Sequence, residues 1–230
     1  MTEQSDYCEE LVRDADKDRF LATLFAPATH RADLYAIYAF DIETASVAHR
    51  VRDSVAGEIR LQWWHDALSS DGESSGHPVA DAMGHLLRRH DLPRAVALDL
   101  VDARRRALYA NDEMTEAEFE LAASEIQSAI IRMAAQVLDG PPGEATRLAA
   151  HHAGVAEAAA QIVPSTVEFD APATVRRHRE AVRNLIPNLP GPVLPAFLPL
   201  ALAVEGRASL PQWRKQWILW RASKNLERWV

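Results

Sequence analysis

Apolar residues recur at helical spacing along almost the whole chain of 230 residues, and this periodicity is the strongest constraint on its fold. Phe20, Leu21, Leu24 and Phe25 fall on one side of a helix, for example, and Pro27 then interrupts the pattern. We find no segment that alternates polar and apolar residues long enough to indicate a strand. The sequence therefore predicts an all-α fold.

Capping and helix-breaking residues divide this pattern into helices with short connections, as in antiparallel bundles. Thr29 is expected to cap the helix after Pro27, and Thr115–Glu118 and Ser209–Gln212 have the form of capping boxes. We expect helices over about residues 20–25, 29–52, 57–68, 78–90, 115–138, 144–163 and 174–185, with further helices starting near residues 93 and 212. Residues 1–15 are expected to be an N-terminal tail, and residues 16–230 a single domain.

The apolar segment 185–204 is long enough to cross a bilayer but contains five prolines. Each proline inside a helix removes a hydrogen bond, at a cost of about 3 kcal/mol. We therefore predict a buried loop followed by a short helix from about Leu194, and not a membrane span.

Composition excludes several classes of protein. The net charge is −8, from 33 acidic and 25 basic residues, which disfavours binding to nucleic-acid backbones. Cys8 is the single cysteine, so an intramolecular disulfide and an all-cysteine zinc site are excluded. The first residues do not resemble a secretory leader. We expect a cytoplasmic protein, with peripheral contact to the inner membrane as a further option.

The spacing of acidic residues and histidines does not single out a metal site. Pairs such as Asp14 with Asp18 and Glu116 with Glu120 could hold Mg²⁺ against a diphosphate. They lie at predicted helix starts, however, where the helix dipole and solvent already favour acids. His151 and His152 are adjacent and are expected to point to different sides of a helix. We therefore assign no metal ligand and no cofactor.

The last predicted helix carries a stripe of large apolar residues: Leu210, Trp213, Trp217 and Trp220. Five basic residues and one acid give segment 210–230 a net charge of +4. Either the tryptophans pack on the core while the basic residues pair with the acidic body, or this helix contacts an anionic membrane or a protein partner. The candidate membrane or partner surface consists of Trp213, Trp217, Trp220, Arg214 and Arg221.

Several short segments together resemble the squalene/phytoene synthases. They are DRFLATLFAP at 18–27, RADLYAIYAF at 31–40, and the shorter segments His77–Val79, Asp91–Pro93, Leu100–Asp102 and Ala153–Ala156. Their order and spacing match that family from about residue 16 to 165. The resemblance implies an isoprenoid-synthase-type antiparallel helical bundle around a central cavity.

The resemblance also implies where metal-binding acids should lie. In active members two Asp-rich motifs hold Mg²⁺ against the substrate diphosphates, which stabilises the leaving group. The first motif falls on residues 45–49, Ala-Ser-Val-Ala-His, which include no carboxylate. The second falls on about residues 161–169, where Pro164 interrupts the helix and Glu168 is the one acid. Asp41, Glu43 and Glu168 remain the candidates for displaced catalytic acids.

The segment GEIRLQWWHDAL at 57–68 resembles one branch of that family, which contains the mitochondrial complex I assembly factor and its bacterial relatives. The leading hypothesis is a non-catalytic protein that binds a protein partner or an isoprenoid-like lipid, in respiratory complex assembly. Its alternatives are an Mg²⁺-dependent prenyltransferase that condenses two prenyl diphosphates, and a lipid carrier. Tyr38, Arg60 and Arg104 are the candidate ligand-binding residues, and Arg104 begins a run of three arginines suited to a phosphate or to acidic partners.

Overall fold

The computed structural model describes residues 3–50, 53–70, 74–109, 114–162, 169–204 and 210–230, and its regular elements there are helices. The α-helices are α1 (Glu3–Ala15), α2 (Lys17–Thr23), α3 (Ala28–Arg50), α4 (Ser54–Ser69), α5 (Pro78–Arg89), α6 (Arg94–Ala107), α7 (Glu116–Asp139), α8 (Glu144–Ala159), α9 (Ala171–Leu185) and α10 (Gln212–Lys224). Three 3₁₀ helices follow α9 or α10: η2 (Ile186–Asn188), η3 (Gly191–Leu202) and η5 (Leu226–Arg228). The predicted all-α class is confirmed.

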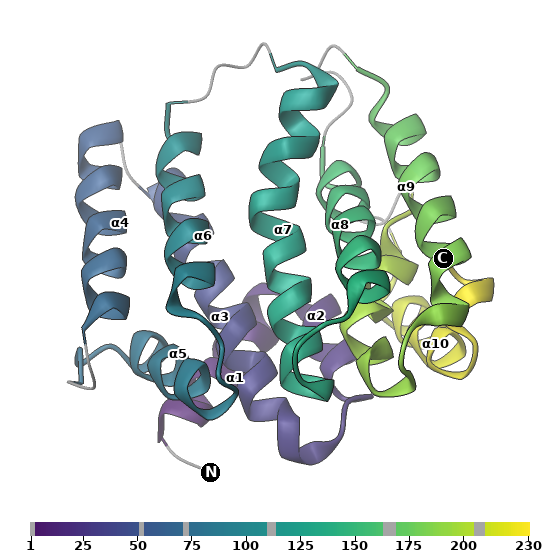
Figure 1. Ribbon diagram of the computed structural model, residues 1–230, viewed down its shortest axis with the longest axis horizontal. Coiled ribbons are helices and arrows are strands. Elements are labelled where there is room, and N and C mark those ends of the chain that lie inside the picture. Colours follow the sequence, from purple (N-terminus) through teal and green to yellow (C-terminus); the bar gives the residue numbers. More distant parts are fainter. Residues whose placement is uncertain (1–2, 51–52, 71–73, 110–113, 163–168, 205–209) are drawn as a thin grey trace.

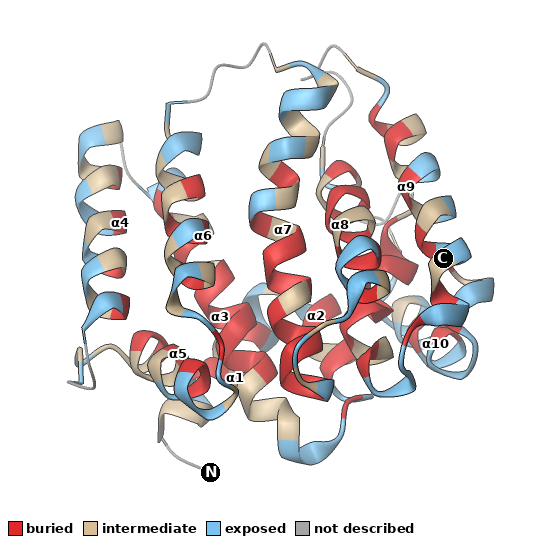
Figure 2. Cartoon of the chain, viewed as in Figure 1, coloured by how far each residue is buried: buried red, intermediate tan, exposed pale blue. Residues whose placement is uncertain are grey.

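The longer helices pack in sequence order around a common core. In Figure 1, α4, α6, α7, α8 and α9 form a row, and each contacts the next. Helices α2, α3 and α5 each contact α1, and α3 also contacts α4, α5, α6 and α7. Figure 2 shows the buried residues along the inward sides of α3, α7 and α8. Large side chains such as Phe40, Met83, Ile130, Met133 and Phe197 fill this core.

Local capping chemistry accounts for several helix ends. At α7 the predicted capping box is confirmed: Thr115 Oγ1 accepts from Glu118 N, and the Glu118 carboxylate accepts from Thr115 N. Thr29, by contrast, lies inside α3, because His30 N already donates to the Pro27 carbonyl at 3.0 Å. The predicted capping box at α10 was wrong, because Pro211 occupies the N-cap without a side-chain bond; Ser209 lies outside the described residues.

The expected N-terminal tail was wrong for the part of segment 1–15 that the structure describes. Residues 3–15 form α1, which packs against α3 and α5. Cys8 and Val12, one turn apart, are fully buried on this packing face. The many acids of the segment lie around a short apolar face, and this face is enough to dock the helix.

Segment 185–204 is helical earlier than expected. The chain enters η2 directly after α9, and η3 begins at Gly191, before Leu194, with Pro195 and Pro199 inside it. The 3₁₀ geometry and the buried side chains of Phe197 and Leu200 place this segment in the core. Among the helices of the described ranges, none is long and apolar enough to cross a bilayer.

Helices α7 and α8 approach closely at Gly154. A Cβ added there would lie 2.4 Å from both the backbone nitrogen and the Oγ of Ser128. Ser128 Oγ also donates to the His151 carbonyl of α8, at 3.1 Å. The contact therefore requires a residue without a side chain at position 154.

Candidate functional site

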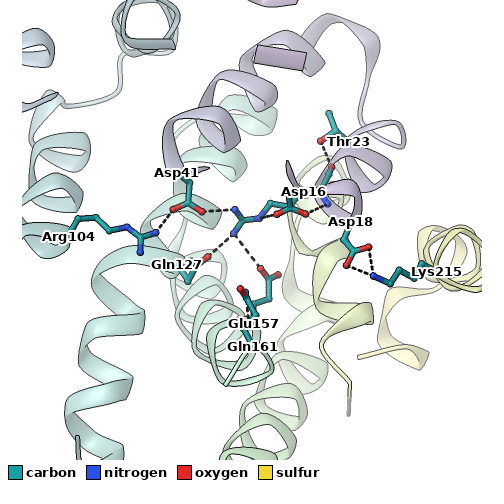
Figure 3. A network of polar contacts seen from close by, with 10 residues as sticks. Asp16, Asp18, Thr23, Asp41, Arg104, Gln127, Glu157, Gln161 and Lys215 are labelled. Carbon is teal, nitrogen blue, oxygen red and sulfur yellow. Dashed lines mark hydrogen bonds and ion pairs between the residues drawn. The ribbon is translucent and has the colours of Figure 1, made fainter. Parts of the chain in front are cut away.

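The buried guanidinium of Arg19 on α2 contacts side chains from three other helices, α3, α7 and α8. Its NH1 group donates to Asp41 Oδ2 on α3 at 2.6 Å, and its NH2 group donates to Gln127 Oε1 on α7 at 2.7 Å. Glu157 Oε2 on α8 lies 3.9 Å from the same NH2 group. Figure 3 shows Asp41, Gln127 and Glu157 on separate helices, each joined by a dashed line to the same guanidinium.

Asp41 has a different arginine on each of its oxygens. Arg104 NH2, on α6, donates to Asp41 Oδ1 at 2.6 Å, while Arg19 holds Oδ2. Burial alone would raise the pKa of Asp41, but Arg104 and Arg19 outweigh burial and lower it below its ordinary value. The carboxylate is therefore ionised at neutral pH and is engaged on both sides. We call Arg19, Asp41, Arg104, Gln127 and Glu157 the central network.

Local structure holds Arg19 in place. Asp16 is the N-cap of α2, and its Oδ1 accepts from Arg19 N at 3.0 Å. The Asp16 side chain also lies 3.7 Å from Arg19 Nε, and the guanidinium lies over the Tyr38 ring, 5.1 Å from its centroid. Burial alone would lower the pKa of Arg19, but Asp41, Asp16 and Glu157 raise it above its ordinary value. The cation is thus fixed before any ligand arrives.

The structure separates the candidate residues that the sequence put together. Arg104 belongs to the central network, and Tyr38 borders it through its contact with Arg19. Arg60 is exposed on α4. Glu43 pairs with Arg50 at 3.3 Å, away from the two arginines that hold Asp41. Glu168 lies outside the described residues.

Helix α10 turns a face without tryptophans to the core. Its buried residues are Ile218, Leu219 and Ala222, while Trp213 and Trp220 are 68% and 51% exposed. The interpretation in which the tryptophans pack on the core is therefore wrong. Ile218, Leu219 and Ala222 fit the helical period equally well, and the smaller side chains are the ones that fit against η3.

The exposed face of α10 combines aromatic and basic groups. The Arg221 guanidinium lies 5.0 Å from the Trp217 ring centroid and 5.9 Å from that of Trp220. Arg214 is exposed beside Trp213. We call Trp213, Trp217, Trp220, Arg214 and Arg221 the tryptophan face. Lys215, on the inward side, pairs with Asp18 of α2 at 3.2 Å and anchors the helix.

Comparisons with known proteins agree with this architecture. The model of the squalene/phytoene synthase family matches residues 12–168. A dehydrosqualene synthase in complex with a ligand superposes with a TM-score of 0.72 at 14% identity, covering 98% of this chain and 97% of that one. A squalene synthase from Alicyclobacillus acidocaldarius gives a TM-score of 0.65 at 16% identity, covering 96% and 93%. The fold is that of the isoprenoid synthases.

The chain belongs to the squalene/phytoene synthase family. Its sequence is similar to NADH dehydrogenase (ubiquinone) complex I, assembly factor 6, at 29% identity over 148 residues for the protein of Bos taurus and 28% over 147 residues for that of Homo sapiens. Each match covers 63% of this chain and 44% of the relative, so it leaves more than half of each relative's length unmatched. The predicted family and its branch are confirmed.

Proposed function

We propose that this protein is a non-catalytic squalene/phytoene synthase-like protein that acts by binding a protein partner in respiratory complex assembly. The observation that supports this proposal is the bonding of Asp41. Ala45, the first residue of the expected Asp-rich motif, lies one helical turn beyond Asp41, on the same side of α3. The nearest acid on that side is thus already neutralised by two arginines.

The charges of the central network oppose a magnesium site. Mg²⁺ takes oxygen ligands in octahedral geometry and is usually held by one or two carboxylates together with substrate phosphates. At Asp41 the ion would have to displace two guanidinium groups, each at 2.6 Å, and would then lie close to both positive charges. The residues present do not fit Mg²⁺, so we derive no prenyl-transfer step for this chain.

Thermal unfolding tests this part of the proposal. A ligand that binds only the folded state raises the unfolding temperature. We expect MgCl₂ with inorganic pyrophosphate, both in excess, to leave the unfolding temperature of the full chain unchanged. Pyrophosphate without Mg²⁺ is the matched control for a simple anion effect. A rise of several degrees that requires both components would contradict the proposal and favour the prenyltransferase alternative.

A binding role in assembly is supported by the named relatives and by the tryptophan face. Tryptophan and arginine are over-represented among residues that dominate protein–protein binding energy. Three exposed tryptophans with Arg214 and Arg221 on a helix anchored by Lys215 offer a preformed patch for an acidic partner. We therefore place the partner contact on α10. Peripheral attachment to the inner membrane from the cytoplasmic side is the location that such a role implies.

A rescue experiment tests this role in cells. Deleting the gene is expected to reduce the amount of assembled complex I, measured by native gel electrophoresis and NADH–ubiquinone activity of membranes. The wild-type gene should restore both readouts. The double variant Trp213→Ala/Trp220→Ala should restore neither, and its circular dichroism should match that of the wild type. Leu121→Ala, which removes a 64% exposed leucine from α7, is the matched control and should rescue fully. Normal complex I in the deletion strain would contradict the role.

A further inference from the structure

Three histidines converge where α8 and α9 pack against each other. His151 and His152 lie on α8 and His178 lies on α9, and each offers one ligand atom within 4.8 Å of the other two. We expected the two adjacent histidines to diverge. Their ring centroids are instead 5.1 Å apart, and His178 lies 6.1 Å from the first and 5.0 Å from the second. Helix α9 packs beside α8 so that its histidine meets both rings.

The closest approach in this cluster joins two nitrogens of like chemistry. His152 Nδ1 and His178 Nδ1 are 3.0 Å apart, so one must carry a proton and the other a lone pair. In a tetrahedral zinc site with Zn–N bonds of 2.0–2.1 Å, two ligand nitrogens are about 3.3 Å apart. A metal ion could therefore replace the bridging proton with a small outward shift of the two rings. The ligand atom of His151 lies within 4.8 Å of those of the other two histidines, so its ring would have to move closer to complete the third bond.

In His178 and His151 another ring nitrogen contacts a polar side chain, as is usual for histidines that bind a metal. His178 is 3% exposed, and its Nε2 lies 3.2 Å from Glu120 Oε1 of α7. A carboxylate on the far nitrogen of a histidine orients the ring and strengthens it as a ligand. Arg177 pairs with both Glu116 and Glu120, which fixes that carboxylate. His151 Nδ1 lies 3.0 Å from Ser124 Oγ, also on α7. The supporting groups thus come from a third helix.

The charge around the three histidines is also compatible with a cation. Glu116 and Glu120 together contribute two negative charges, and Arg177 contributes one positive charge. The immediate surroundings therefore carry a net negative charge against an incoming divalent ion.

We propose that His151, His152 and His178 form a binding site for a divalent transition metal of the zinc class, with water as the fourth ligand. Imidazole ligands select Zn²⁺ and its neighbours over Mg²⁺ and Ca²⁺. The role we infer is structural. Helix α9 buries few side chains, Ala171, Thr174, His178 and Val182, and a metal would fasten it to α8. This site is independent of the proposed assembly role and of diphosphate chemistry.

The test is metal binding by the full chain, purified without a histidine tag and stripped with a chelator. After dialysis against micromolar ZnCl₂ we expect about one zinc per chain by elemental analysis, and a higher unfolding temperature than for the stripped protein. Co²⁺ in place of Zn²⁺ should give the visible absorption of a tetrahedral site. A wild-type chain that takes up no zinc would overturn the proposal without recourse to any variant.

Variants locate the site. His151→Ala and His152→Ala, both at half-buried positions, should each lose the bound zinc and the cobalt absorption while keeping their helical circular dichroism. Glu120→Gln should weaken zinc binding by about 10- to 100-fold, as is usual for loss of an outer carboxylate. His85→Ala, at an exposed histidine of α5, is the matched control and should bind as the wild type does. Full zinc binding by His152→Ala would overturn the assignment.

Discussion

Replacing Asp41 by Asn is expected to lower the free energy of unfolding by about 3–5 kcal/mol, the usual cost of removing one partner from a buried ion pair. The variant retains the size of the side chain but leaves Arg19 and Arg104 without the carboxylate that each contacts at 2.6 Å. Two buried or half-buried cations would then face each other across a neutral amide. Urea unfolding at pH 7, followed by circular dichroism, measures the difference.

Two comparisons show whether this effect belongs to the buried carboxylate. Glu9→Gln removes the same type of charge from an exposed pair with Arg13 on α1, and should cost no more than about 0.5 kcal/mol. Because the arginines lower the pKa of Asp41, its contribution is present above the ordinary carboxyl pKa and is lost as the pH falls through the lowered one. Wild type and Asp41→Asn should therefore converge in strong acid. A loss below about 1 kcal/mol at pH 7 would contradict our account of the network.

Gly154→Ala is expected to lower the free energy of unfolding by about 1–3 kcal/mol, the range for overpacking a tight core. In an open helix the same change stabilises by about 1 kcal/mol, because alanine has the higher helix propensity. Here the new Cβ would lie 2.4 Å from the Ser128 backbone nitrogen, so α7 and α8 must separate. The sign of the change is therefore the informative quantity.

Gly84→Ala on α5 is the matched control for that sign. The nearest atom to a Cβ at this position is Arg88 NH1 at 3.5 Å, the mobile end of a long side chain. We expect this variant to be more stable than the wild type by about 0.5–1 kcal/mol. Equal or greater stability of Gly154→Ala in the same urea experiment would show that the helix contact is looser than described.

Most of the fold was predictable because it depends on local signals. Helical periodicity and breakers placed α3 to α9 within a few residues, and the capping box at Thr115 was confirmed. Helix α1 was not predicted, because its apolar face is short and many acids surround it. The start of η3 was predicted too late, because 3₁₀ geometry accommodates prolines that would break an α-helix. Helix α10 has two apolar faces, one with the tryptophans and one with Leu219, and the pattern alone does not say which is buried. In the structure the face with Leu219 packs on the core.

The candidate site was less predictable because its contacts join distant parts of the chain. Asp41 and Arg104 were candidates separately, but they meet across 63 residues, and no spacing rule pairs them. Arg19 and Glu157 were not candidates at all. Arg19 lies in a segment that carried the family resemblance, which was the one signal that could have drawn attention to it. The histidine cluster needed the position of α9 on α8, which periodicity does not contain.

The central claim is that this chain binds a protein partner and does not convert prenyl diphosphates. Its most direct test is calorimetric titration with farnesyl and geranylgeranyl diphosphate, with and without Mg²⁺. Product analysis on the same samples completes it. We predict no Mg²⁺-dependent binding and no condensed product, because Asp41 is held by two arginines and the expected motif at residues 45–49 has no carboxylate. Mg²⁺-dependent binding with formation of a condensed prenyl product would contradict the account and identify an enzyme.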